Sequence, residues 1–298
     1  MKHLLVAIAK KYWKIFFLFV FIPVLLAVFL LKPLPSTQGN PRSSGSVFLG
    51  FFERGSETKL RDSPGFKGLT ELKSINVPIL VHHYVEVVTD ERDFIRRSLS
   101  IRPDYFERQL KYLIDIGYTF ISLDDLSDAL LRNRTLPDKP VVLTFDDGYR
   151  DFYTDAFPIL KRYGIKSVNY IVPAFIGKDQ NYLDAGQIKE MLATGLLEIG
   201  AHTMNHVDLP SLSGEALFRE INGSKKYLED NFGVPVRHFA YPWGISDDRV
   251  NKAVKSAGFI SGVSIQKGVV NRESDLYFLP RLHVGNIEPE ALLRVMEK

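Results

Sequence analysis

Short apolar runs alternate with segments of helical periodicity from residue 77 to the end of this 298-residue chain, and this alternation limits the possible folds more than any other feature. The apolar runs are predicted to be strands: residues 77–82, 141–145, 167–172, 197–201, 237–240, 260–265 and 278–284. The segments of helical periodicity are residues 105–116, 123–132, 152–163, 185–194, 214–231, 247–256 and 289–297. Because near-continuous apolar strands that alternate with helices form parallel sheets, we expect an α/β fold with about seven parallel strands.

Polar residues gather where the predicted strands end, and this placement favours a closed barrel over an open sheet. They are His82, His83, Asp146, Asp147, His202, residues 241–243 and His283. In a (β/α) barrel the carboxyl ends of all strands meet at one rim, whereas an open doubly wound sheet gathers such groups only around one crevice. We therefore expect an irregular (β/α) barrel whose reactive groups line that rim.

An unbroken apolar run precedes this region, at residues 15–31. As a helix it would span roughly 26 Å, which is near the lower limit for crossing a hydrocarbon core of about 30 Å. The alternative is a cleaved signal peptide, but the run is long for one and residues 32–35 lack a small-x-small cleavage site. We therefore expect an uncleaved transmembrane anchor.

Lysines before the apolar run set the expected orientation of this anchor. They are Lys2, Lys10, Lys11 and Lys14. Because positively charged flanks stay in the cytoplasm, residues 1–14 are predicted to be cytoplasmic and the rest of the chain extracytoplasmic. Residues 32–74 are rich in Pro, Gly and Ser and are predicted to be a linker. The expected location is thus the cell membrane, with a single span and a catalytic domain at residues 75–298.

Composition excludes several classes of function. The net charge is only +3, and no basic block with interleaved aromatic residues is found, so nucleic-acid binding is not expected. The chain has no cysteine, which excludes disulfides, zinc–thiolate sites and cysteine nucleophiles.

Two short segments at predicted strand ends carry the residue types of a metal site. His202 and His206 are four residues apart, and Asp146 and Asp147 follow another strand. Imidazole nitrogens with one carboxylate suit zinc, cobalt, nickel or iron, and a second carboxylate can serve as a base beside the same water. The alternatives are structural hydrogen bonds for the histidines and an ordinary turn or helix cap for the aspartates.

Residues 144–149 and 202–206 together resemble the polysaccharide deacetylase family, also known as the NodB-homology or carbohydrate esterase 4 group. The first segment matches the T-F-D-D-G motif, and the second has two histidines with three residues between them. Residues 77–83 resemble the opening strand of the family, residues 106–126 its first helix and next strand, and residues 241–244 its third motif. The resemblance covers about residues 75–298, and the Tyr-Pro-Trp-Gly and Pro-Arg-Leu segments are most similar to the branch that acts on exported poly-N-acetylglucosamine.

The resemblance implies a role for each matching residue. Asp147, His202 and His206 would bind a divalent metal, most simply zinc, and Asp146 would be the general base. The backbone N–H of Trp243 would stabilise the oxyanion, and His283 would protonate the leaving amine. Apart from the resemblance, four aromatic residues lie near the predicted rim and would stack on sugar rings: Tyr241, Trp243, Phe145 and Tyr149. Ordinary packing is the alternative for each of them.

The third motif departs from the family pattern. Ala240 stands where the family carries an arginine that orients the catalytic aspartate, and no clear Asp-x-x-Asp-Trp motif is found. Arg281 is our candidate replacement for that arginine, and His83 is a second supporting residue.

These features predict a metal-dependent hydrolase that removes N-acetyl groups from N-acetylglucosamine units of a cell-envelope or exported polysaccharide. The expected partners are the acetylated glycan and, through residues 15–31, the membrane. Two alternatives stay open: an O-acetyl esterase or amidase of the same fold, and a weakly active glycan-binding protein.

Overall fold

The structure, a computed structural model, describes residues 74–297. The predicted cytoplasmic segment, the anchor at residues 15–31 and all of the predicted linker except its last residue lie outside the described residues. Within residues 74–297, no helix is both long enough and apolar enough to span a bilayer.

Eight parallel strands form the main sheet. They are β2 (Ile79–His82), β5 (Thr119–Ile121), β6 (Pro140–Asp147), β7 (Ser167–Ile171), β8 (Leu197–Ala201), β9 (His238–Ala240), β10 (Ser261–Val263) and β12 (Leu282–His283). The order is β10-β9-β8-β7-β6-β2-β12, and β5 pairs with the first residues of β6. Every strand on this path overlaps one of the predicted apolar runs, so the prediction of about seven parallel strands is confirmed.

The two ends of this path are joined through a divided last strand. Leu279 forms a parallel bridge with Val263 of β10, and Leu282 then pairs with Leu80 of β2. Pro280 lies between the two pairings and has no N–H to donate to a ladder. The predicted strand 278–284 is therefore reduced to the short β12, and the arrangement fits an irregular (β/α) barrel.

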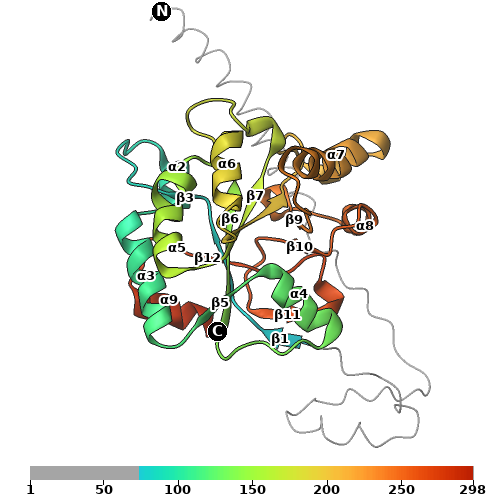
Figure 1. The fold of residues 1–298 in the computed structure, drawn as a ribbon. Helices are drawn as coiled ribbons and strands as arrows, with labels where there is room; N and C mark the ends of the chain where they lie inside the picture. The colour runs from blue at the N-terminus through green and yellow to red at the C-terminus, as the bar shows by residue number, and fades with distance from the viewer. Residues whose placement is uncertain (1–73, 298) are drawn as a thin grey trace, which may run out of the picture. The chain divides into compact units, whose positions relative to one another are not determined.

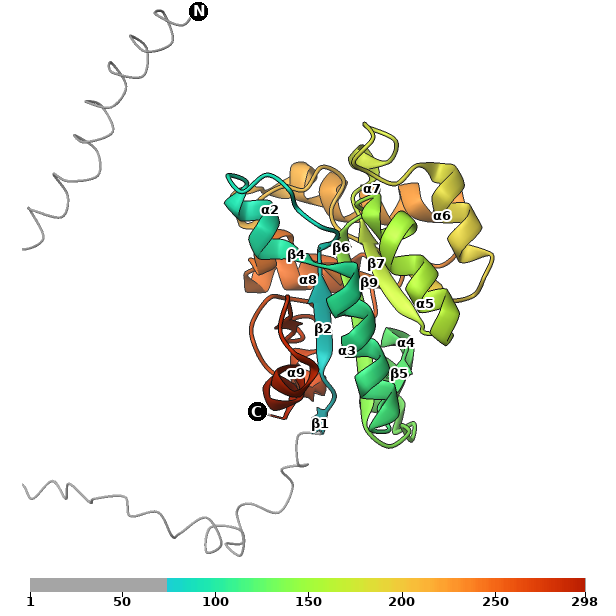
Figure 2. The same ribbon diagram turned by 90° about the vertical axis from the view of Figure 1, so that its left-hand side faces the viewer.

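Helices surround the sheet (Figures 1 and 2). Their bounds are α2 (Phe94–Leu99), α3 (Pro103–Asp115), α4 (Leu123–Arg132), α5 (Phe157–Tyr163), α6 (Ala185–Leu192), α7 (Gly214–Phe232), α8 (Asp248–Ser256) and α9 (Pro289–Met296). Helix α3 packs beside α9, and α7 packs beside α8. The segment before α5, Phe152–Ala156, is a turn of π-helix rather than the regular helix that the sequence predicted.

Local sequence explains where several helices begin and end. Ser122 caps α4 and Asp184 caps α6, each in a reciprocal capping box with the residue three positions later. Gly164 ends α5 at φ 63° and Gly233 ends α7 at φ 67°, a left-handed conformation that glycine adopts without steric cost.

Five small elements were not predicted. They are helix α2 and the strands of two pairs, β3 (Tyr84–Val85) with β4 (Ser100–Ile101) and β1 (Ser74–Asn76) with β11 (Val270–Arg272). Strands of two or three residues are too short to show alternation, and α2 buries none of its residues.

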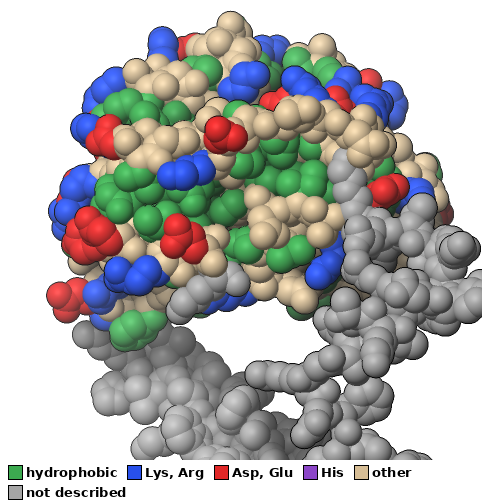
Figure 3. Space-filling model, turned by 90° about the horizontal axis from the view of Figure 1, so that it is seen from below, with side chains coloured by type: hydrophobic (Ala, Val, Ile, Leu, Met, Phe, Trp, Pro, Cys, Tyr) green, Lys and Arg blue, Asp and Glu red, His purple; other side chains and the backbone are tan. Residues whose placement is uncertain are grey.

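The barrel interior is apolar and closely packed. Val142, Val168, Tyr170 and Val263 belong to one buried cluster. A Cβ at Gly200 would overlap the ring of Tyr170, so only glycine lets this ring fill the space beside β8. Seen from below, the end of the molecule at which the strands begin presents hydrophobic and charged side chains, and no described histidine is visible on it (Figure 3).

Candidate active site

The carboxyl ends of neighbouring strands bring the predicted site residues together. Asp146 and Asp147 are the last residues of β6, and His202 directly follows β8. Ala240 ends β9, and His283 ends β12. Because all these strands are parallel, their ends lie at one rim, as the barrel prediction required.

Asp147, His202 and His206 form a compact triad. The candidate ligand atoms of the three residues all lie within 4.8 Å of one another. Asp147 Oδ1 lies 3.4 Å from His202 Nε2 and 3.3 Å from His206 Nε2. Asp147 and His202 are buried, at 7% and 2% exposure, whereas His206 is partly open to solvent.

The donor set of this triad fits a divalent cation. Asp147 Oδ1 is buried and has no hydrogen-bond partner among the described residues. The Nδ1–H of His202 donates to the carbonyl of Ala240 at 2.7 Å, so Nε2 is the ring nitrogen that faces Asp147. Burial alone would lower the pKa of His202, but the neighbouring aspartates raise it, and a metal ion would take the place of the proton that this raised pKa favours on Nε2. Two acceptor atoms that face each other in a buried site need a positive charge between them, so a carboxylate and two imidazoles suit zinc, cobalt, nickel or iron.

Unusual backbone conformations fix the triad. Asp147, Thr203 and His206 have positive φ angles of 75°, 62° and 55°. A non-glycine residue in this region costs of order 1–3 kcal/mol and persists where the surroundings enforce it. Thr203 Oγ1 accepts a hydrogen bond of 2.9 Å from the backbone N–H of His206, which holds the second histidine in place.

A buried arginine holds Asp146. The two terminal nitrogens of Arg281 donate to the two carboxylate oxygens of Asp146, at 2.8 and 2.6 Å. Arg281 Nε donates to the carbonyl of Ser264 at 2.7 Å, and Nη1 also donates to Thr144 Oγ1 at 3.1 Å. Burial alone would raise the pKa of Asp146, but the guanidinium keeps that pKa well below its usual range, so the carboxylate stays ionised. Arg281 thus contacts Asp146, the residue that we expected it to orient.

Two further histidines lie at the same rim. The rings of His83 and His283 have centroids 6.2 Å apart, and His283 is exposed. Burial lowers the pKa of both residues, and the positive charge of Arg281 adds to this effect at each. Both imidazoles are therefore biased toward the neutral form.

The predicted aromatic residues differ in exposure and in the side chains that they contact. Trp243 is 52% exposed and meets the ring of His206 edge to face, with centroids 4.6 Å apart. Tyr149 is stacked between Tyr84 and Tyr182, at centroid distances of 3.9 and 5.3 Å, so both of its faces are covered. Of the four aromatic residues predicted to stack on sugar, Trp243 is the one whose side chain presents an open face beside the triad.

The prediction that Tyr241 and Phe145 stack on sugar is wrong. Both side chains are 1% exposed. The hydroxyl of Tyr241 donates to the carbonyl of Tyr277 at 2.6 Å, and its ring packs on Phe239. Phe145 packs against Phe152. Ordinary packing, the alternative reading, holds for these two residues.

Sequence reasoning overlooked Tyr84 and Tyr182, which complete the stack around Tyr149. Tyr84 directly follows His83, and its position after a predicted strand end was the available signal. Tyr182 lies in a loop and carried no comparable signal.

Comparisons with known proteins agree with this geometry. A family model described as polysaccharide deacetylase matches residues 133–261, which include both aspartates and both histidines of the site. The protein YxkH of Bacillus subtilis (strain 168), named for the same family, is 32% identical over 213 residues that cover 72% of this chain and 73% of YxkH. The chain belongs to the polysaccharide deacetylase family.

One further relative and one solved structure are also similar to the chain. Poly-β-1,6-N-acetyl-D-glucosamine N-deacetylase of Staphylococcus aureus (strain MSSA476) is 28% identical over 210 residues, 66% of this chain and 72% of that protein. The solved structure of the Streptococcus pyogenes deacetylase PplD in complex with acetate is 31% identical with a TM-score of 0.71, and covers 76% of this chain and all of PplD (100%). Arg281 and His283 lie beyond the residues that the family model matches.

Proposed function

We propose that the chain is a metal-dependent N-deacetylase that acts on N-acetylglucosamine units of a cell-envelope or exported polysaccharide. The observation that carries the proposal is the unpartnered, buried Oδ1 of Asp147, which faces Nε2 of both His202 and His206. The similarity to the poly-β-1,6-N-acetyl-D-glucosamine N-deacetylase supports an N-acetylated glycan as the substrate.

Asp147, His202 and His206 would hold the cation, with zinc as the first candidate and cobalt, nickel or iron as alternatives. When bound, the ion supplies Lewis-acid activation of the amide and of the attacking water.

Three other residues would move the protons and charge of the reaction. Asp146 accepts the proton of the attacking water, because Arg281 uses only part of the acceptor capacity of its two oxygens. The backbone N–H of Trp243 donates to the oxygen on which negative charge develops. His283, exposed at the rim, delivers a proton to the departing amine from its protonated form, which its lowered pKa makes a stronger acid.

Membrane attachment is part of the proposal. The apolar run at residues 15–31 would anchor the chain, with residues 1–14 in the cytoplasm and the catalytic domain on the outer side. A glycan outside the cell would then be in reach of the rim.

The test is to measure the acetate released from N-acetylglucosamine oligomers and the new primary amines formed on them, with acetylated xylan as the comparison substrate. We expect equal amounts of acetate and amine from the oligomers, and loss of turnover with retained metal in Asp146→Asn. Acetate release from xylan alone would identify an O-acetyl esterase, and undiminished turnover in Asp146→Asn would overturn the assignment of the base.

A further inference from the structure

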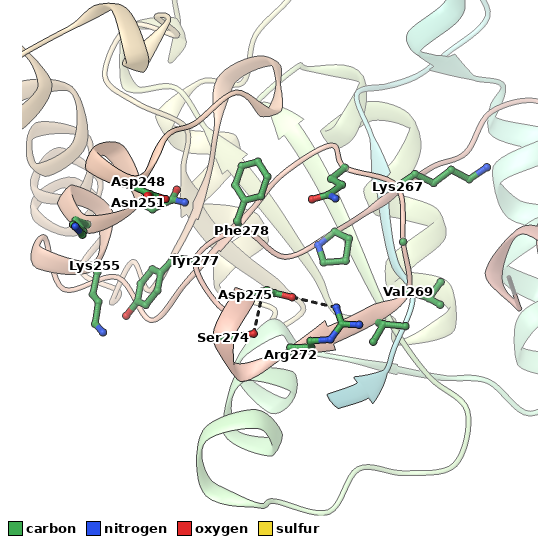
Figure 4. Close-up of a pocket in the computed structure, with 15 residues that line it drawn as sticks. Asp248, Asn251, Lys255, Lys267, Val269, Arg272, Ser274, Asp275, Tyr277 and Phe278 are labelled. Carbon is green, nitrogen blue, oxygen red and sulfur yellow. Dashed lines mark hydrogen bonds and ion pairs between the residues drawn. The ribbon is translucent and has the colours of Figure 1, made fainter. Parts of the chain in front are cut away.

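A cavity opens on the flank of the barrel, apart from the triad of Asp147, His202 and His206. Its volume is about 690 Å³, within the range of ligand pockets. It lies between α8, β11 and the chain from Gln266 to Pro280, and none of Asp147, His202 and His206 lines it (Figure 4).

Two half-buried aromatic rings, those of Tyr277 and Phe278, give the cavity an apolar surface. The hydroxyl of Tyr277 donates to the carbonyl of Phe259 at 3.1 Å, and the carbonyl of Tyr277 accepts from Tyr241. Tyr277 is therefore fixed before any ligand arrives, and an aromatic side chain fixed in this way contributes contact area at little entropic cost.

The polar lining offers donors and acceptors together. The side-chain amides of Asn251 and Gln266 each carry both kinds of group. Arg272 pairs with Asp275 at 3.4 Å, and Ser274 Oγ donates to the same carboxylate at 2.9 Å, as Figure 4 shows. Hydroxyl and acetamide groups also donate and accept, so this lining is complementary to an N-acetylated sugar.

Charge distinguishes the acetylated sugar from its deacetylated product. Four cationic side chains line the cavity, those of Lys252, Lys255, Lys267 and Arg272, against the two carboxylates of Asp248 and Asp275. This excess of positive charge repels the ammonium of a glucosamine unit and leaves a neutral acetylated unit unaffected.

Along the chain, the residues that line the cavity begin shortly after β10 ends at the rim. A Cβ at Gly244 would lie 2.6 Å from the backbone nitrogen of Ile265, so the turn that carries Trp243 is pressed against Ile265. Ile265 is 54% exposed, and the next residue, Gln266, lines the cavity.

We propose that this cavity binds a still acetylated stretch of the same polysaccharide chain while another unit lies at the metal triad. The inference rests on the proposed function for the identity of the glycan. It makes the enzyme prefer polymer over short fragments, and acetylated over deacetylated chain.

The test uses the full-length chain in detergent and calorimetric titration with an N-acetylglucosamine tetramer. All chains titrated, including the one that is wild type at the cavity, carry Asp146→Asn, so that the tetramer is bound without being hydrolysed. Ser274→Trp fills the cavity from an exposed position, and Thr135→Trp fills a separate cavity of about 300 Å³ as the matched control. We expect two tetramers per wild-type chain, one per Ser274→Trp chain and two per Thr135→Trp chain. A glucosamine tetramer should not bind at the cavity.

Equal stoichiometry and affinity in Ser274→Trp and wild type would overturn the inference, and so would absence of tetramer binding to the wild type. Acetate release from an N-acetylglucosamine dimer, measured in parallel, should be unchanged in Ser274→Trp. Binding at the cavity without any acetate release by the wild type would refute the proposed function and leave the cavity site standing.

Discussion

Replacing Arg281 by methionine tests how the site holds its base. The guanidinium is 1% exposed and donates to both oxygens of Asp146, to the carbonyl of Ser264 and to Thr144. Methionine fills a similar volume but leaves the buried carboxylate unpaired. Removing one partner of a buried pair costs about 3–5 kcal/mol. For a domain of this size, that loss lowers the melting temperature by roughly 6–20 °C.

The same change should also lower turnover. An unheld Asp146 can rotate away from the attacking water, and misplacement by about 1 Å can cost on the order of 100-fold in rate. Arg281→Lys keeps the charge but loses the paired bonds, so we expect an intermediate loss of kcat. Urea unfolding and acetate release, measured on the same preparations, provide the two values.

A double variant separates the structural effect from the catalytic one. In Asp146→Asn combined with Arg281→Met, no buried charge is left unpaired, so stability should recover relative to Arg281→Met while turnover stays lost. Wild-type stability and kcat in Arg281→Met would refute the reasoning. A double variant less stable than Arg281→Met would refute the attribution of the loss to the unpaired carboxylate.

Three further predictions concern the metal, pH and packing. Asp147→Ala and His202→Ala should each abolish metal binding, measured as metal content per chain, together with acetate release, and either variant with full metal content would remove that residue from the ligand set. Burial raises the pKa of Glu198 from 4.5 to about 7. The contribution of this group to the free energy of unfolding is therefore full below pH 4.5 and is lost as pH rises through 7. Glu198→Gln should be up to about 3 kcal/mol more stable than wild type at pH 8, with no difference at pH 4. Gly200→Ala forces a methyl group into the ring of Tyr170 and should cost about 1–3 kcal/mol in urea unfolding, and an unchanged midpoint would contradict the packing described for the barrel interior.

The sequence predicted the parts of the fold that are long and periodic. Each strand on the barrel path lies over an apolar run, and helix α4 spans the predicted residues 123–132. Strands β1 and β11 pair although they lie nearly 200 residues apart in the sequence. Single-sequence periodicity contains no information on such a pairing.

At the site, residue type and strand position pointed to a metal site, and the resemblance to the polysaccharide deacetylase family was needed to identify Asp147, His202 and His206 as its ligands. Arg281 could be inferred because Ala240 leaves Asp146 without its usual partner, and a buried carboxylate needs one. The burial of Tyr241 could not be inferred, since it stands two residues before the exposed Trp243 and both are aromatic. Which of them faces inward depends on the left-handed turn at Trp243, where φ is 54°.

The most direct test of the central claim is a zinc titration of the metal-stripped full-length chain, with acetate release and the formation of primary amines on N-acetylglucosamine oligomers as the readout. The proposal predicts no release without metal, a rise in proportion to the zinc added, and a plateau at one ion per chain. Full release from the metal-free chain, or acetate release without new amines at any zinc level, would contradict it.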